Sequence, residues 1–392
     1  MITTILLIIS VLYVFMTLTL WWGWRRIPYA QTTPLTDGPL ISVVIPVRNE
    51  AANLPHLLAD LARQTYTRFE VIVADDSSTD DTVAVVQKLV NDLPYTLHLL
   101  PLPNEKTGAP KKRAIAQSIR IAQGELILTT DGDCRVGPDW VRSFAAYYRQ
   151  HQPRMMTGPV TFTPDWTDDI SFGEMSSVQS GGGLVGLFGQ LQTVEFSSLI
   201  GSGAATLALN NPTMCNGANL CYEKRVFEEV NGFAGIDHVA SGDDELLMHK
   251  IARRYPGGVQ FLKNRDAIVQ TAPHSSWVAF YQQRKRWASK WKAYESWHPS
   301  ALAIFVFLSN MAPVVAVLGG VGGLVPWPIV LLIIGLKTIP EFIFLRAILR
   351  FLQKPGAARW IPATQLVYPF YVVLFGLAAQ QKGFTWKGRS LK

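Results

Sequence analysis

The sequence predicts an α/β fold, in which a mostly parallel sheet has helices on both faces and apolar segments flank it at both ends of the chain. Two observations predict it. Between residues 40 and 130, short apolar runs alternate with segments whose leucines recur every three or four residues, the pattern of alternating strands and helices. At both ends, long apolar runs reach the length that spans a bilayer.

The first apolar run, residues 2–24, carries no charge and can cross a bilayer as a helix. A signal peptide is the alternative, but no basic region precedes the run and no small-residue cleavage site follows it. We therefore expect a retained transmembrane anchor over residues 1–24. The tryptophans that precede Arg25 and Arg26 are typical of an aromatic belt at the cytoplasmic face.

The expected middle domain, residues 40–300, opens with a regular series of apolar runs and helical patterns. Residues 40–46 form a continuous apolar run, as expected for a strand buried on both faces. A helix is expected from Asn49 to about Arg63. Further strands are expected at 69–74, 95–100 and 125–130, and further helices at about 80–92 and 110–122.

Polar clusters follow three of these strands: Arg48-Asn49-Glu50, Asp75-Asp76 and Asp131-Gly132-Asp133. Ligands of parallel sheets bind beyond the carboxyl ends of the strands, so we expect the clusters to converge there. Asp131 and Asp133 would lie on the same side of an extended chain, where two carboxylates can bind a hard divalent cation. A plain turn is the alternative for this cluster alone.

The stretch 151–240 is less regular. Within it, residues 180–203 are rich in Gly and Ser and low in charge. They predict either an apolar loop or an amphipathic helix lying at the membrane surface, and we favour the helix.

The C-terminal region, residues 301–380, contains candidate spans at 301–323, 327–345 and 361–379, followed by a basic tail at 381–392. Basic residues flank 361–379 on both sides and favour the cytoplasm for both, which one crossing cannot satisfy. Two prolines in this segment leave a re-entrant or interfacial path open. Lys337 and Glu341, four residues apart, are expected to neutralise each other.

The formal net charge of +7 belongs to the ends of the chain. Residues 41–300 contain 25 Lys or Arg and 27 Asp or Glu, whereas the flanks contain 11 and 2. Basic flanks indicate membrane topology and contact with anionic lipids, so nucleic-acid binding is not expected. The three cysteines match no zinc spacing and are expected to be free thiols.

Six motifs together resemble membrane-bound family 2 glycosyltransferases of the GT-A type, over essentially the whole chain. They are, in chain order, ISVVIPVRNE, FEVIVADDSSTD, NEKTGAPKKRAI, TTDGDC, SGDDELLMHKI and QRKRW. The resemblance implies a GT-A (Rossmann-like) nucleotide-sugar-binding domain with N- and C-terminal transmembrane helices. It also implies an inverting, metal-dependent transferase at the cytoplasmic face of the inner or plasma membrane, with a UDP-sugar as the expected donor.

The resemblance also assigns residues. Asp243 matches the general base, although Gly242 replaces the family's preceding Glu and leaves Asp244 as an alternative base. Asp133, supported by Asp131, would bind Mg²⁺ or Mn²⁺. The donor would contact Pro46, Arg48, Glu50, Asp75, Lys106, Lys111 and Asp131. Lys112 and Arg113 would add charge near the phosphates, and a solvated basic helix start is the alternative for Lys111, Lys112 and Arg113. The acceptor or diphosphate would contact Asp244, Gln283, Arg286 and Trp287.

Two of these assignments have structural alternatives. The segment that contains Arg284, Lys285, Trp287, Lys290, Trp291 and Trp297 also suits an amphipathic helix at the membrane surface. His274 is expected to be structural, because no other histidine stands at ligand spacing.

Three functions fit this sequence. A single transfer to a membrane-lipid acceptor is favoured, because the candidate spans are few for a sugar-conducting channel. A processive polysaccharide synthase of the cellulose, chitin or hyaluronan type is the second hypothesis, with a glycan acceptor. A catalytically inactive membrane scaffold that retains the fold is the third, from another class.

Overall fold

A computed structural model describes residues 1–392 apart from Pro34, Thr36, Lys106, 164–183, 289–297, 379–383, Lys387, Gly388 and Lys392. Lys106, an expected donor contact, therefore lies outside the described residues. So do Lys290, Trp291 and Trp297, and part of the basic tail.

A mixed sheet of seven strands forms the centre of the fold, in the order β3-β2-β1-β4-β8-β6-β9. The first four strands are parallel, and β8 runs antiparallel to both β4 and β6. The predicted α/β fold is confirmed. The strands are β1 (Ile41–Val47), β2 (Phe69–Asp75), β3 (Thr96–Pro101), β4 (Leu126–Thr129), β6 (Met155–Thr157), β8 (Leu220–Glu223) and β9 (Val259–Phe261).

A second sheet has the order β5-β10-β7. Its strands are β5 (Cys134–Val136), β7 (Val160–Phe162) and β10 (Val269–Thr271). The helices of the domain are α2 (Leu54–Ala62), α3 (Thr82–Leu89), α4 (Pro110–Ile121), α5 (Trp140–His151), α7 (Lys224–Glu229), α8 (Glu245–Arg254) and α9 (Trp277–Ala288).

The helix expected from Asn49 begins later, at Leu54. Asn49 has a φ of 54°, in the left-handed region, which a right-handed helix excludes. The side chain of Asn49 accepts a hydrogen bond from the backbone N–H of Thr79 at 2.8 Å. The segment after β1 is thus a loop fastened to the loop after β2, and it brings the first two polar clusters together.

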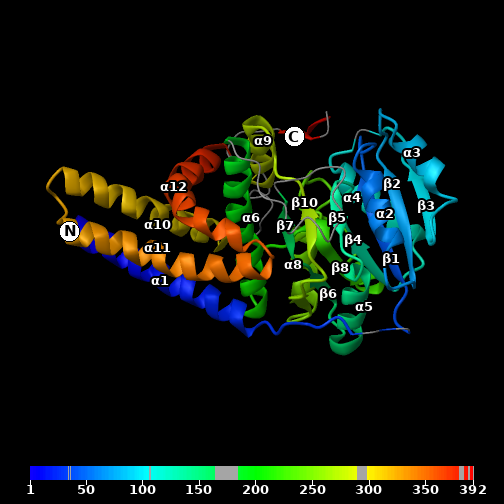
Figure 1. The fold of residues 1–392 in the computed structure, drawn as a ribbon, viewed down its shortest axis with the longest axis horizontal. Coiled ribbons are helices and arrows are strands. Elements are labelled where there is room, and N and C mark those ends of the chain that lie inside the picture. The colour runs from blue at the N-terminus through cyan, green and yellow to red at the C-terminus, as the bar shows by residue number, and fades with distance from the viewer. Residues whose placement is uncertain are drawn as a thin grey trace.

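A long helix, α6 (Leu184–Ala208), stands between the sheets and the apolar helices (Figure 1). It packs against β7 and β9 on one side and against α1, α11 and α12 on the other. The predicted helix is confirmed for the described part of 180–203. Its predicted amphipathic character is wrong, because no side chain described between residues 186 and 208 is exposed, and an amphipathic surface helix needs an exposed polar face. Its place relative to the membrane stays a prediction.

Within the described part of the chain, four helices are long and apolar enough to cross a membrane. They are α1 (Ile2–Arg26), the Ala301–Val321 part of α10 (His298–Val321), α11 (Trp327–Phe351), and α12 (Ile361–Ala378) with the 3₁₀ turn η3 (Pro355–Trp360) before it. In Figure 1, α1, α10 and α11 extend from the domain on the side away from the large sheet. The side chains of α1, α10 and α11 pack together in a separate apolar cluster around Leu6, Ala316 and Val330.

The expected pair of Lys337 and Glu341 is present, with Nζ 3.0 Å from Oε1. The Tyr13 hydroxyl of α1 donates a hydrogen bond to Glu341, and Lys337 donates one to Gln365 of α12 at 2.6 Å. Charged groups in apolar helices are costly unless they are paired. This network therefore fastens α1, α11 and α12 to one another.

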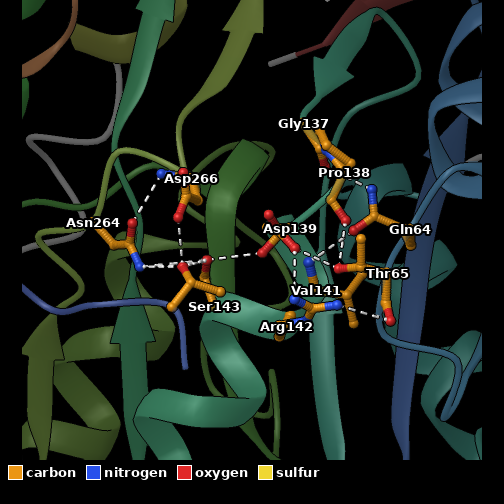
Figure 2. Close-up of polar contacts among 11 residues, drawn as sticks. Gln64, Thr65, Gly137, Pro138, Asp139, Val141, Arg142, Ser143, Asn264 and Asp266 are labelled. Atoms are coloured by element: carbon orange, nitrogen blue, oxygen red, sulfur yellow. Dashed lines mark hydrogen bonds and ion pairs between the residues drawn. The ribbon is translucent and has the colours of Figure 1, made fainter. Parts of the chain in front are cut away.

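Hydrogen bonds also fix the segment that follows β5 (Figure 2). Gln64, just after α2, donates to the carbonyl of Gly137 at 2.7 Å and accepts from the N–H of Val141 at 3.0 Å. On the other side of α5, Asn264 donates to the Ser143 hydroxyl at 3.4 Å. The start of α5 is thus held between α2 and the loop that precedes β10.

A buried ion pair holds β5 itself. Arg135 donates two hydrogen bonds to Asp60 of α2, at 2.6 and 2.9 Å, and the N–H of Val136 donates a third at 3.2 Å. Asp60 is 1% exposed and Arg135 is 6% exposed. Because β5 directly follows Asp131-Gly132-Asp133, this pair anchors one end of that turn.

Asp60→Asn is expected to destabilise the full chain by about 3–5 kcal/mol, because it removes the buried negative charge that Arg135 contacts through two hydrogen bonds. Arg63→Ala is the matched control, since Arg63 contacts the same carboxylate from an exposed position, and its loss is expected to cost about 0–1 kcal/mol. Denaturant unfolding in detergent, followed by tryptophan fluorescence, measures both. Equal losses from the two variants would contradict the anchoring role of Asp60 and Arg135.

Candidate active site

A cavity of about 2190 Å³ opens at the carboxyl ends of β1 and β4. Its lining includes most of the predicted site residues: Pro46, Arg48, Glu50, Lys111, Asp131, Asp133, Asp243, Asp244, Gln283, Arg286 and Trp287. These residues come from opposite ends of the domain sequence. Their predicted convergence at one edge of the sheet is therefore confirmed as geometry, whereas their roles stay predictions.

The turn Asp131-Gly132-Asp133 joins β4 to β5 and faces the cavity. A Cβ on Gly132 would lie 3.0 Å from the Val47 side chain and 3.1 Å from that of Glu50. The turn thus packs closely against the end of β1. Glycine permits this approach and leaves the two flanking carboxylates at the cavity wall.

Lys111, in the first turn of α4, lies between two of the acidic residues. Its Nζ is 2.7 Å from Asp131 Oδ1 and 3.2 Å from Asp243 Oδ2. Burial alone would lower the pKa of Lys111, but the charges of Asp131 and Asp243 raise it above the usual value. The ammonium group therefore remains charged and offsets the repulsion between carboxylates that the fold brings together.

The structure separates the roles of Asp243 and Asp244. Asp244 accepts hydrogen bonds from the backbone N–H groups of Gly217 at 3.0 Å and Glu245 at 2.7 Å, and it is the N-cap of α8. Asp243 instead points to Lys111 at the cavity wall. Asp244 thus has a structural role, and of the two candidates for the base Asp243 is better placed.

The replacement of the family's Glu by Gly242 also has a structural explanation. Gly242 has a φ of 76°, a left-handed conformation that a glycine adopts without strain and a glutamate does not. The backbone turns at this residue to place Asp243 and Asp244 on different partners.

The acidic turn after β2 lies behind the cavity wall. Asp75 is 3% exposed, accepts a hydrogen bond from the N–H of Ser78 at 3.1 Å, and does not line the described cavity. Arg48 joins this turn to the cavity, because its guanidinium donates to the carbonyls of Asp76 at 2.6 Å and Ser77 at 2.5 Å. The expected contact of Asp75 with a nucleotide therefore stays a prediction.

Two basic residues next to Lys111 have structural roles. Lys112 is buried and donates to the carbonyls of Ile236 at 2.6 Å and Val239 at 2.9 Å. Arg113 pairs with Asp76 at 2.8 Å and with Glu105 at 3.0 Å. The alternative of a solvated helix start is therefore wrong for these two residues, whereas their expected charge near phosphates stays a prediction.

The QRKRW motif lies on α9, where Gln283, Arg286 and Trp287 face the cavity. The ring of Trp287 stacks on Phe196 of α6, with centroids 6.0 Å apart. Arg284 does not fit the expected membrane-surface helix, because it is buried against Glu195 of α6. The helix is thus fixed by contacts on its inner side.

Sequence reasoning missed several cavity residues: Glu195, His274, Arg284 and Tyr371. Within the described part of the chain, Nε2 of His274 is buried and has no hydrogen-bond partner. Burial lowers its pKa, so the imidazole is neutral at pH 7. Arg284 stands inside the QRKRW motif, but the sequence pattern assigned it to a membrane-surface helix. The meeting of these four residues at one cavity depends on contacts between segments far apart in the sequence.

The far part of the cavity is apolar. It is lined there by Leu302, Ile304 and Phe307 of α10 and by Val372, Phe375 and Leu377 of α12. A ligand site usually has about 300–1,000 Å³, so a cavity of about 2190 Å³ has room for more than one substrate.

Comparisons with known proteins identify the family. The model of glycosyl transferase family group 2 matches residues 126–349, and the model of glycosyl transferase family 2 matches residues 42–201. The chain belongs to glycosyl transferase family group 2. The predicted family 2 glycosyltransferase domain is thereby confirmed, whereas its membrane-bound nature stays a prediction.

Individual relatives match this chain over shorter stretches of sequence. The poly(ribitol-phosphate) beta-N-acetylglucosaminyltransferase TarS of Staphylococcus aureus is 34% identical over 112 residues, which is 28% of this chain and 19% of TarS. The undecaprenyl-phosphate 4-deoxy-4-formamido-L-arabinose transferase of Pseudomonas syringae is 33% identical over 104 residues, which is 25% of this chain and 29% of that protein. The chain thus spans less than a third of the length of either relative.

The fold is also similar to that of a solved structure over nearly the whole length of the chain. The mannosyltransferase PcManGT from Pyrobaculum calidifontis, in complex with GDP-Man and Mn²⁺, covers 97% of both chains with a TM-score of 0.57 and 17% sequence identity. This likeness extends through the apolar helices, and it confirms the predicted GT-A-like fold flanked by N- and C-terminal apolar helices.

The position of Lys111 predicts an energetic coupling with Asp131. In a double-mutant cycle of Lys111→Gln and Asp131→Asn, the two changes are expected to be non-additive by about 0.5–3 kcal/mol, because each removes the partner of the other. The free energy of unfolding of the full chain measures this. A cycle of Asp131→Asn with Lys88→Gln, at an exposed position of α3, is the additive control. Additivity in both cycles would contradict the ion pair.

Proposed function

We propose that this chain is an inverting, metal-dependent glycosyltransferase that moves a sugar from a nucleotide-sugar, expected to be a UDP-sugar, to a membrane lipid at the cytoplasmic face. One observation carries the proposal. A single cavity is lined at one end by Asp131, Asp133 and Asp243, and at the other by two apolar helices that could cross a membrane. A water-soluble donor and a lipid acceptor can therefore meet in it.

The residues present fit a divalent cation of the Mg²⁺ or Mn²⁺ kind. Asp131 and Asp133 offer two carboxylates at the cavity wall, while in the described part of the chain no three His, Cys, Asp or Glu side chains form a ready metal site. Mg²⁺ is commonly held by one or two carboxylates together with substrate phosphates. When bound, such an ion stabilises the charge of the departing diphosphate.

The chain's own residues supply the rest of the donor site. Lys111 is the charged donor nearest to the two acidic groups, and it would transfer its contact from Asp131 to a phosphate oxygen. Arg48, Pro46 and Glu50 would line the path from the phosphates to the acidic turn at Asp75.

Asp243 would be the general base. It accepts the proton of the acceptor hydroxyl while that oxygen attacks the anomeric carbon from the face opposite the diphosphate, so the configuration inverts. The bond to the diphosphate breaks, and Lys111 offsets the charge that develops. Gln283, Arg286 and Trp287 would position the acceptor or the diphosphate from α9, since Arg pairs with phosphate and Trp offers a flat face.

This proposal places residues 1–24 and 301–380 in the membrane and the domain 40–300 in the cytoplasm. The four candidate spans support single transfer, because a translocating synthase needs helices that line a sugar channel. Polymer synthesis and an inactive scaffold are the outcomes that would contradict it.

Asp243→Asn is expected to lower kcat about 10²–10⁴-fold, because the amide cannot accept the acceptor proton. Asp244→Asn is the matched control. Asparagine caps helices about as well as aspartate but keeps only one of the two oxygens that accept from Gly217 and Glu245, so this variant is expected to lose far less activity than Asp243→Asn. Transfer of radiolabelled sugar in purified membranes measures both. If Asp244→Asn lowers kcat as much as Asp243→Asn does, the proposed assignment of the base to Asp243 is wrong.

A donor screen on membranes that contain the full chain is expected to show release of nucleoside diphosphate with one nucleotide-sugar. Chelation is expected to stop this release, and Asp133→Asn to lower it about 10²-fold, because the leaving charge loses its counter-ion. Labelled product is expected to extract with lipid. A ladder of long polymer would contradict the lipid acceptor, and metal-independent release would contradict the cation.

A further inference from the structure

Three helices that line the cavity meet at one buried ion pair. Glu195 of α6 accepts a hydrogen bond from Arg284 of α9 at 3.1 Å, and a second, shorter one from the same guanidinium. The Tyr371 hydroxyl of α12 donates a third at 2.8 Å. Glu195 is 5% exposed and Arg284 is 3% exposed, and all three side chains line the cavity.

The same pair fixes the QRKRW helix. The guanidinium of Arg284 lies over the rings of Phe280 and Trp287, 4.5 and 4.2 Å from their centroids. Arg284 is thus held by a carboxylate and by two aromatic faces. Because Trp287 belongs to the expected acceptor side, the pair couples that side to α6 and α12.

The ion pair of Glu195 and Arg284 lies at the boundary between the polar part and the apolar part of the cavity. α6 packs on the domain's strands on one side and on the apolar helices on the other, as Figure 1 shows. Asp131 and Asp243 belong to the domain side of the cavity, and Phe307 and Phe375 belong to the side of the apolar helices. A lipid that reaches Asp243 with its tail along α10 and α12 would therefore pass Glu195, Arg284 and Tyr371.

The net charge of the residues that line the cavity limits which lipid headgroups can pass the boundary. Among the described residues that line the cavity, seven are Asp or Glu and four are Lys or Arg, so negative charge is in excess. The charges of a donor diphosphate and of a divalent cation cancel, and they leave this excess in place. Of the two arginines of α9 that line the cavity, Arg284 is already neutralised by Glu195, and Arg286 would contact the donor diphosphate.

An anionic headgroup would thus meet repulsion and no uncommitted cation at the boundary, whereas a hydroxyl would not. A carboxylate has about four acceptor positions, and the described contacts of Glu195 use three. A hydroxyl headgroup can donate to the remaining one and accept at Tyr371. The proposed general base is also consistent with a hydroxyl acceptor, because a hydroxyl must lose its proton as it attacks, whereas an ionised phosphate has none to lose.

From this arrangement we infer that the acceptor is an uncharged, hydroxyl-headed membrane lipid, and that Glu195, Arg284 and Tyr371 select it by guiding its headgroup toward Asp243. The inference rests on the proposed function and narrows its substrate class. Lipids with a terminal phosphate are excluded as acceptors by the same charges.

The test uses matched lipids with the full chain in nanodiscs and the donor found in the screen. The pairs are diacylglycerol with phosphatidic acid of the same acyl chains, and a polyprenol with the corresponding polyprenyl phosphate. Label is expected on a hydroxyl lipid at least about tenfold faster than on its phosphate partner, a difference of about 1.4 kcal/mol. Faster labelling of either phosphate lipid, or label on neither hydroxyl lipid, would overturn the inference.

Two variants test the role of the ion pair. Tyr371→Phe removes one hydroxyl, and Glu195→Leu with Arg284→Met removes both charges together, which avoids leaving one buried charge unpaired. Each is expected to raise KM for the hydroxyl lipid and to lower the ratio of transfer to donor hydrolysis about tenfold. Transfer and hydrolysis falling in parallel would show that the pair only holds the fold, and would overturn its selective role.

Donor hydrolysis separates this inference from the proposal on which it rests. Nucleoside diphosphate release together with label on a phosphate lipid would leave the glycosyltransferase in place and overturn only the acceptor class. No release with any nucleotide-sugar would overturn both. Lys88→Gln, far from the cavity, is the control variant and is expected to change neither rate.

Discussion

Repulsion between carboxylates is the constraint on which this site depends. The sheet edge and α8 bring Asp131, Asp133 and Asp243 to one cavity, and such a cluster opposes folding unless positive charge offsets it. Lys111 supplies that charge, since one ammonium contacts both Asp131 and Asp243. The same ammonium is then at hand for a diphosphate. One residue thus serves the stability of the free protein and the chemistry proposed for the loaded one.

A second constraint is the junction between the domain and the apolar helices. α6 is apolar enough to pack against both, and its one acidic residue, Glu195, is neutralised by Arg284. A buried pair of this kind contributes little net stability. The pair of Glu195 and Arg284 instead sets the positions of helices, because it joins α6, α9 and α12 around a continuous cavity. It also leaves no net charge at the boundary.

The sequence predicted what depends on local patterns. Apolar runs located the parallel strands, and turns rich in Asp located the edge at which the cavity forms. It could not predict contacts that depend on packing between distant segments. The burial of Lys112 under Ile236 and Val239 is one example, and the capping by Asp244 that distinguishes it from Asp243 is another. The interpretation of α6 failed because low charge suits a buried helix as well as a surface one.

The most direct measurement of the central claim is a structure of the full chain in a lipid nanodisc with Mn²⁺ and the nucleoside diphosphate released in the donor screen. The account predicts that Lys111 leaves Asp131 for a phosphate oxygen and that Asp133 is a ligand of the Mn²⁺ ion, while Asp243 faces an open path to α10 and α12. A diphosphate bound outside this cavity, or Lys111 still paired with both Asp131 and Asp243 beside bound diphosphate, would contradict it.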